Sequence, residues 1–168
     1  MPAEQLCFMG RGTDLHQTAM TPHRNEMRLV FPADSLAVRR ALQASMAGLT
    51  HLELSQDDKG TVELVLAEVL NNVVEHAYAQ NAAGVIELQV ERKDQMLEVS
   101  VTDEGVPLPN HALPTSGQHD LEVPVDNLPE GGFGWFLIKE LTQDLRYSRN
   151  GSQNRLTFIL PLQGTRVS

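Results

Sequence analysis

The sequence contains a single cysteine, Cys7, among its 168 residues. One cysteine excludes an intrachain disulfide framework and a metal cluster built from cysteines alone, so we interpret Cys7 as a thiol in a terminal tail. No apolar run approaches the roughly 20 residues that a membrane-spanning helix needs. No secretory signal opens the chain either, and we therefore expect a cytoplasmic protein.

Positive charge is also scarce: 13 lysines and arginines stand against 22 acidic residues, which gives a net charge of −9. This balance argues against a nucleic-acid-binding protein, because such proteins usually carry a basic face. It does not exclude a nucleotide ligand, since a local site can differ from the overall field. An acidic surface suits a basic protein partner, although it more often serves solubility.

Regular patterning is absent from the start of the chain. Residues 1–26 lack sustained periodicity and contain Gly10, Gly12 and Pro22, which is typical of a mobile tail or of an arm that docks on a partner. We expect residues 27–168 to form one domain, because this length and a hydrophobic content of 41% suffice for one core.

Apolar periodicity predicts the secondary structure, since a period of two indicates strands and a period near 3.6 indicates helices. Pro32 ends the first strand, Asp34 or Ser35 can cap the first helix, and Asn150-Gly151 predicts the turn of the last hairpin. The order of elements predicts an α+β fold, a two-layer sandwich with a mostly antiparallel sheet. The predicted strands cover about 27–31, 86–91, 97–102, 145–147 and 156–160, and the predicted helices about 35–48, 56–78 and 134–142.

Three polar side chains line one stripe of the second predicted helix, in the segment EVLNNVVEHAY. Glu68, Asn72 and His76 are spaced by four residues, which is about one helical turn. Asn71 and Asn72 are poor helix formers, because their amides compete for backbone hydrogen bonds. A bound metal or polar ligand would explain them, and a solvated helix face that tolerates asparagine is the alternative.

Asp103 ends a predicted strand in the segment DEGVP. It continues the alternation of Val99 and Val101, which directs its carboxylate toward the buried face. A buried carboxylate is costly unless it is hydrogen-bonded, so Asp103 is a candidate acceptor for the amino group of a ligand. Gly105 and Pro107 would let the chain turn tightly against that ligand. The alternative is an aspartate that caps its own turn.

Three glycines, Gly131, Gly132 and Gly134, precede the last predicted helix in the segment GGFGWFL. Glycines let backbone N–H groups approach phosphate oxygens, and a helix N-terminus favours anions. An ordinary helix cap is the alternative. The segment is not a Rossmann fingerprint, because no strand feeds directly into it, and it is not a Walker A loop, because no Gly-Lys-Ser/Thr follows.

In combination and in this order, the three segments make the chain resemble the GHKL ATPase superfamily over about residues 27–162. EVLNNVVEHAY is similar to the family's N box, DEGVP to its first glycine box, GGFGWFLIKEL to its second, and NRLTFILPL to its last strand. Within the superfamily, the chain looks most like the bacterial anti-sigma-factor serine/threonine kinases. The resemblance implies the Bergerat ATP-binding fold, with the helices on one face of the sheet.

The resemblance also implies roles toward ATP and Mg²⁺. Asn72 would coordinate Mg²⁺ between the ATP phosphates, and Glu68 would act as the general base toward a serine hydroxyl or a water molecule. Asp103 would accept the adenine amino group, directly and through water. His76 would line the site without a catalytic role.

The glycine segments and the long loop receive roles in the same way. Gly105 would pack near the adenine. Gly132 and Gly134, with Gly131 before them, would bring backbone N–H groups to the phosphates. Residues 108–130 would form the ATP lid.

Two features depart from the family pattern. The expected lid, residues 108–130, contains no lysine or arginine, although a basic group near the γ-phosphate normally stabilises the transition state. Lys139 or Arg146 would have to substitute for it. Trp135 stands where the family more often has a smaller aliphatic residue, and we expect it to pack in the core.

The leading hypothesis is an ATP-dependent serine/threonine protein kinase that phosphorylates an anti-anti-sigma partner of the STAS type and sequesters a sigma factor. By analogy it would form a homodimer and would contact neither nucleic acid nor a membrane. One alternative is an ATP-binding partner-switch regulator without efficient kinase activity, which the acidic lid favours. Another is a histidine-kinase-like catalytic domain, against which we note that no dimerising helix with a phospho-acceptor histidine precedes the expected domain.

Overall fold

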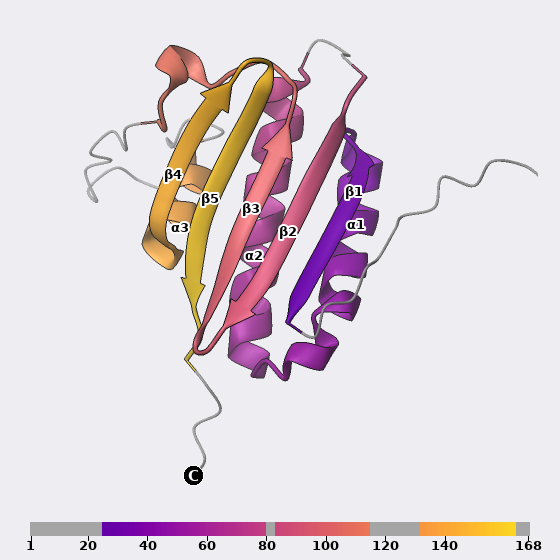
Figure 1. The fold of residues 1–168 in the computed structure, drawn as a ribbon, viewed down its shortest axis with the longest axis vertical. Coiled ribbons are helices and arrows are strands. Elements are labelled where there is room, and N and C mark those ends of the chain that lie inside the picture. The colour runs from indigo at the N-terminus through magenta and orange to yellow at the C-terminus, as the bar shows by residue number, and fades with distance from the viewer. Residues whose placement is uncertain (1–24, 80–82, 115–131, 164–168) are drawn as a thin grey trace, which may run out of the picture.

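A single five-stranded antiparallel sheet forms one layer of the computed structural model, which describes residues 25–79, 83–114 and 132–163 (Figure 1). The strand order is β1-β2-β3-β5-β4, and all four pairings within the described residues are antiparallel. The strands are β1 (Glu26–Pro32), β2 (Val85–Lys93), β3 (Met96–Asp103), β4 (Gln143–Asn150) and β5 (Gln153–Pro161).

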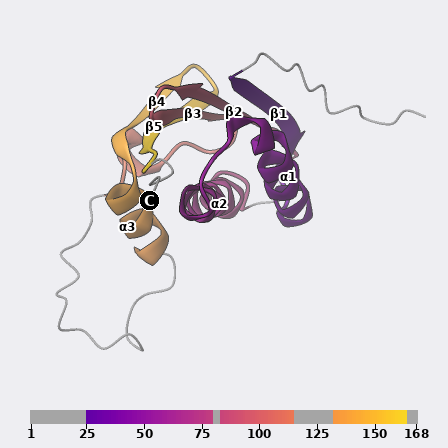
Figure 2. The same ribbon diagram turned by 90° about the horizontal axis from the view of Figure 1, so that it is seen from below.

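Helices form the second layer and cover one face of the sheet (Figure 2). This arrangement confirms the two-layer α+β fold that the sequence predicts. The helices are α1 (Ser35–Gly48), α2 (Gln56–Asn72) and α3 (Gly132–Leu141), with a π-helical turn η2 (Val73–Ala77) and two short 3₁₀ turns, η1 (Thr50–Leu52) and η3 (Pro109–His111). None of the helices in these described parts of the chain is long and apolar enough to cross a membrane.

Side-chain caps fix where the first two helices begin. The Asp34 carboxylate accepts a hydrogen bond from the Ala37 N–H at 2.8 Å, as the sequence predicts for the start of α1. The Ser55 hydroxyl accepts from the Asp58 N–H at 3.0 Å and donates to the Asp58 carboxylate at 2.7 Å. Asp58 also accepts from the Gln163 N–H at 2.9 Å, so the start of α2 is tied to the end of β5.

The core lies between the sheet and the helices. The alternating side chains of β2 and β3 that face the helices are buried, and the apolar stripe of α2 packs in the same cluster. Leu66, Ile86, Leu88 and Leu97 are fully buried, and each contributes about 2 kcal/mol by leaving water. This packing holds the C-terminal half of α2 against the sheet, where the candidate site lies.

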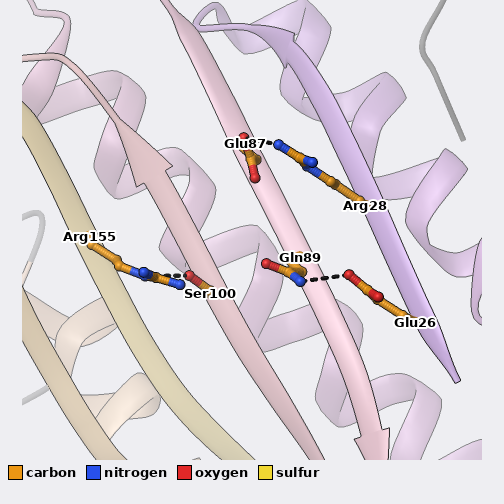
Figure 3. A network of polar contacts seen from close by, with 6 residues as sticks. All are labelled: Glu26, Arg28, Glu87, Gln89, Ser100 and Arg155. Carbon is orange, nitrogen blue, oxygen red and sulfur yellow. Dashed lines mark hydrogen bonds and ion pairs between the residues drawn. The ribbon is translucent and has the colours of Figure 1, made fainter. Parts of the chain in front are cut away.

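The outer face of the sheet is polar, as the alternation of β2 and β3 predicts. Cross-strand pairs cover it: Arg28 with Glu87 at 2.9 Å, Gln89 with Glu26 at 2.6 Å, and Arg155 with Ser100 at 3.1 Å (Figure 3). Exposed pairs of this kind contribute little stability. These pairs identify the polar face of the sheet, which is the face opposite the helices.

The structure corrects several predicted boundaries. The second helix does not continue as an α-helix to Tyr78, because α2 ends at Asn72 and the chain then widens into the π-helical turn η2. The last helix begins at Gly132, two residues before the predicted start. Pro32 is the last residue of β1, whose edge position tolerates a missing N–H. Residues 1–24, most of the expected tail, and residues 115–131, most of the expected lid, lie outside the described residues.

Candidate nucleotide-binding site

A narrow pocket opens at one end of the inner sheet face, between the last turns of α2 and η2, the end of β3, the start of α3 and the last hairpin. Its polar lining residues are Asn72, His76, Asp103, Tyr147 and Asn154, and the remaining lining residues are apolar. A mostly apolar pocket with a few converging polar groups is typical of small-molecule sites. The structure therefore brings three of the sequence-predicted site residues to one pocket.

Asp103 is buried, with 6% of its surface exposed. Its Oδ1 accepts hydrogen bonds from the Gly105 N–H at 2.8 Å and from Asn154 Nδ2 at 2.9 Å. The first of these bonds is the Asx turn that the sequence offers as an alternative explanation. The carboxylate nevertheless also lines the pocket, so turn formation and ligand binding are compatible at this position.

Burial raises the pKa of the Asp103 carboxyl above its usual range. The hydrogen bonds from Asn154 and Gly105 and the positive charge of Arg149 oppose this rise. A carboxylate that is buried beside an apolar pocket and still stabilised by placed donors is a common feature of functional sites. The environment of Asp103 thus suits a hydrogen-bond acceptor that a ligand can reach.

The sequence analysis does not single out Tyr147 and Asn154, which line this pocket, or Arg149, which contacts Asn154. The Asn154 Oδ1 accepts from the Tyr147 hydroxyl at 2.7 Å and from Arg149 Nη1 at 2.6 Å. A usable signal was present, because Asn154 is in phase with Leu156 and the other buried residues of β5. The same alternation argument that singled out Asp103 would have singled out Asn154.

The loop after β3 docks on the end of the helix. The Val106 N–H donates to the Ala77 carbonyl at 2.9 Å. A Cβ on Gly105 would lie 2.5 Å from the same Ala77 carbonyl oxygen, so only glycine allows this close approach. Pro107 is half-buried, between two residues that line the pocket.

Glu68 and Asn72 meet the start of α3 at Gly134. A Cβ on Gly134 would lie 2.5 Å from Glu68 Oε2 and 3.8 Å from Asn72 Nδ2. The glycine therefore leaves space for the carboxylate between the two helices. This contact joins the first and third sequence segments, which are more than 60 positions apart in the chain.

Asn72 is buried, and its Nδ2 has no hydrogen-bond partner among the described residues. An unpaired buried amide costs about 1–3 kcal/mol. Turning the amide by 180° would place its oxygen, the atom that can ligate a cation, at this position instead. Such an atom is well placed to meet a bound group.

The π-helical turn η2 begins directly after Asn72 and contains His76. Turns of this kind are rare and occur often at functional sites. Asn72 is buried whereas His76 is exposed, yet both line the pocket. Of the predicted stripe, Asn72 and His76 line the pocket and Glu68 does not, and the step from Asn72 to His76 crosses a wider turn than an α-helix has.

Of the three glycines predicted to bind phosphates, Gly131 lies outside the described residues. Gly132 is the first residue of α3, and Gly134 lies within its first turn instead of preceding the helix. Trp135 is buried in the core, as predicted, and it also lines the pocket.

The two basic residues that the sequence offered as substitutes for a lid cation lie elsewhere. Arg146 is on the outer face of the sheet, 76% exposed, with its guanidinium 3.7 Å from the Asp144 carboxylate. Lys139 donates to the Pro114 carbonyl. Arg149 is the cation near Asp103, and it contacts Asn154.

A two-layer α+β domain with this pocket at the end of its inner sheet face is a nucleotide-binding domain of the GHKL class. The chain belongs to the histidine kinase-like ATPase domain family, whose model matches residues 31–160. It is homologous to the RsbW serine kinases of that class.

Two relatives illustrate the similarity. A serine-protein kinase RsbW of Bacillus mycoides (strain KBAB4) is 30% identical over 122 residues, which are 72% of this chain and 74% of the relative. The serine-protein kinase RsbW of Bacillus cereus (strain AH187) is 31% identical over the same length and the same shares of the two chains.

A solved structure supports the fold. The RsbU and RsbW domains of a Mycobacterium tuberculosis protein superpose with a TM-score of 0.55 at 17% identity. The match covers 84% of this chain and 33% of that one, so this chain spans about a third of the solved protein. At this identity the likeness shows the fold alone.

Family membership implies that the domain binds ATP, and the residues present fit this ligand. The pocket is apolar, as a purine ring requires, and Asp103 places an acceptor at its inner end. The buried amide of Asn72 would offer its oxygen to Mg²⁺, or its unpartnered Nδ2 to a phosphate oxygen. In the described ranges, no group of three or more acidic, histidine or cysteine side chains is placed to hold a metal ion by itself.

Proposed function

We propose that this protein is an ATP-dependent serine/threonine protein kinase that regulates a sigma factor by partner switching. The acceptor would be a serine of a STAS-type anti-anti-sigma protein, and the unphosphorylated partner would compete with the sigma factor for this domain. The observation that carries the proposal is the meeting of Glu68, Asn72 and Gly134 at the start of α3. It is supported by the similarity to serine-protein kinases.

The proposed chemistry assigns one task each to Asp103, Asn72 and Glu68. Asp103 binds the amino group of the adenine, and Asn72 holds the Mg²⁺ that neutralises phosphate charge when the nucleotide is bound. Glu68 accepts the proton of the attacking hydroxyl, in a position that Gly134 keeps open. Phosphoryl transfer depends mainly on positioning and charge stabilisation, so a few well-placed groups suffice.

A second function is favoured by one specific observation. The chain between residues 108 and 130 lacks lysine and arginine, and Arg146 lies on the outer sheet face. Without a lysine or arginine side chain near the γ-phosphate, the domain would bind ATP as a switch ligand and transfer phosphate inefficiently. It would then regulate its partners by binding alone.

Titration calorimetry with ATP, in the presence and absence of Mg²⁺, tests the binding step. We expect Mg²⁺-dependent binding that is lost in Asp103→Asn and in Asn72→Ala. Absence of binding by the wild-type protein would contradict both functions.

Transfer of radiolabelled γ-phosphate to a purified STAS-domain protein of the same organism then separates the two functions. Glu68→Gln should retain ATP binding and lose transfer if the protein is a kinase. Glu63→Gln is the matched control, because Glu63 is an exposed carboxylate of the same helix. Wild-type binding of ATP together with no transfer to any STAS partner would favour the regulator.

A further inference from the structure

Three residues from three neighbouring strands form a row at the end of the sheet. Asp103 of β3 pairs in register with Asn154 of β5, and Asn154 pairs with Arg149 of β4. All three belong to the inner face: Asp103 and Asn154 are in phase with the buried residues of β3 and β5, and Arg149 is in phase with the half-buried residues of β4. Tyr147, one step along β4 on the same face, also reaches Asn154. We call the hydrogen-bonded set of Tyr147, Arg149 and Asn154 the clasp.

The chemistry of the donors fixes the orientation of the Asn154 amide. Arg149 cannot be deprotonated and carries no acceptor, so its Nη1, 2.6 Å away, must face the amide oxygen. The Tyr147 hydroxyl accepts from the Leu108 N–H at 3.1 Å and therefore directs its own proton to the same oxygen. The amide nitrogen must then face Asp103, to which it donates at 2.9 Å.

The clasp also determines which oxygen of Asp103 a ligand can use. Both hydrogen bonds that the described residues make to this carboxylate, from Gly105 and Asn154, end on Oδ1. Oδ2 therefore remains available as an acceptor in the pocket that Asp103 lines. Because the clasp presents only donors, it stabilises the charged form of Asp103 against the cost of burial.

We propose that Asn154, oriented by Arg149, is a positioning residue that keeps Asp103 a pure acceptor. The pocket would thereby select a purine that carries an amino group at position 6 over one that carries a carbonyl there. An amino group can donate to Oδ2, whereas a carbonyl oxygen would face it acceptor to acceptor. This inference rests on the proposed ATP site and adds the residues that set its selectivity.

Binding of three triphosphates in the presence of Mg²⁺ tests the inference: ATP, inosine triphosphate and purine riboside triphosphate, which lacks any group at position 6. We expect wild-type protein to bind ATP about 100-fold more tightly than inosine triphosphate, since the latter leaves two buried acceptors opposed. Purine riboside triphosphate should fall between them, because it loses the hydrogen bond without adding repulsion.

The informative variant is Asn154→Asp, which has nearly the same shape. It places two carboxylates at hydrogen-bonding distance, and they cannot both be ionised. Arg149 lies beside residue 154, so the charge should settle there and the proton on Asp103 Oδ2, the oxygen available to a ligand, while Oδ1 keeps its hydrogen bond from the Gly105 N–H. A protonated Asp103 can donate to a carbonyl, so the preference for ATP over inosine triphosphate should fall to about tenfold or less.

Arg149→Met is a second variant that leaves the shape of Asn154 unchanged, and it should lower the same preference by a smaller factor. Arg155→Met is the matched control. Arg155 follows Asn154 in β5 but lies on the outer face, where it donates to Ser100 (Figure 3). The Arg155→Met substitution removes the same charge from the protein and should leave the preference for ATP over inosine triphosphate unchanged.

A readout without nucleotide separates this inference from the proposed function. Carbon-detected NMR of the free protein should show Asp103 titrating at higher pH in Asn154→Asp than in wild type. The other titratable groups around it, His76, Tyr78 and Glu104, are the same in both proteins.

An unchanged Asp103 titration and an unchanged nucleotide preference in folded Asn154→Asp would overturn the inference while the ATP site stands. Failure of the wild-type protein to bind any of the three triphosphates would overturn the proposed function, and the base selection with it.

Discussion

Gly134→Ala should lower the rate of phosphoryl transfer and leave the fold intact, because the added methyl group meets a side chain that can move. The new Cβ would lie 2.5 Å from Glu68 Oε2, whereas ordinary contacts begin at 3.4 Å, so the carboxylate oxygen must move by 3.4 − 2.5 = 0.9 Å. A misplacement of about 1 Å in a catalytic group can lower a rate roughly 100-fold. The helix itself gains from alanine, so the fold should persist.

The assay for this variant combines three measurements: turnover of ATP with its phosphate acceptor, ATP affinity by calorimetry, and thermal unfolding. We expect turnover to fall about 100-fold, while affinity and unfolding temperature stay close to wild type. The control is Gly60→Ala. Gly60 lies in α2, and a Cβ there would meet nothing within 4 Å. It should stabilise the protein by about 1 kcal/mol and leave turnover unchanged.

Wild-type turnover in Gly134→Ala, with alanine present in a folded α3, would refute the reasoning. It would mean that the position of Glu68 beside Gly134 has no part in the reaction. If this variant fails to fold, the reasoning that the Glu68 carboxylate can move away from the added methyl group is wrong. The contact at Gly134 would then be with a group that cannot move.

Other substitutions should separate binding from stability. In Asp103→Asn, ATP binding should be lost, while urea midpoints should exceed those of wild type increasingly as pH rises above 4, until pH passes the folded-state pKa of Asp103. The sign follows because burial raises the folded-state pKa of Asp103, so the wild-type carboxyl contributes stability in acid and loses it as pH rises through that pKa. Gly105→Ala places a Cβ 2.5 Å from the Ala77 carbonyl oxygen, which is backbone and cannot yield easily, so unfolding should become easier by roughly 1–3 kcal/mol. Asn72→Leu removes an amide that lacks a partner among the described residues, so the free protein should keep or gain stability in urea while Mg²⁺-dependent ATP affinity disappears.

Local sequence patterns are enough to predict the fold, because the spacing of apolar residues and the residues at the ends identify each helix and strand. The alternation of β2 and β3 and the cap at Asp34 act within a few residues, so the sequence alone predicts them. The boundary at Asn72 was missed, because the π-helical turn after it depends on how the end of the helix meets the loop at Gly105. That contact joins residues that are distant in the chain.

The site residues also divide into those that local sequence patterns predict and those that depend on contacts between distant residues. Asp103 was found because a polar residue on a buried strand face is conspicuous, and Asn154 would have been found by the same argument. The function of Arg149 could not be read from its strand, since an arginine at a half-buried position normally extends to solvent. Only the register of β4 against β5 places it beside Asn154.

The pocket and the Glu68 carboxylate are held in place by different means, and this makes their contributions separable. Hydrogen-bonded register across three strands fixes Asp103 and Asn154, so substitutions there change which ligand binds. Glu68 does not line the pocket, and packing of α2 against α3 holds it beside Gly134. Helix packing allows small shifts that register does not, so a shift of Glu68 should change turnover before it changes affinity. A protein that evolved to bind ATP without transferring phosphate would need to alter only this contact and would keep Asn72 and Asp103.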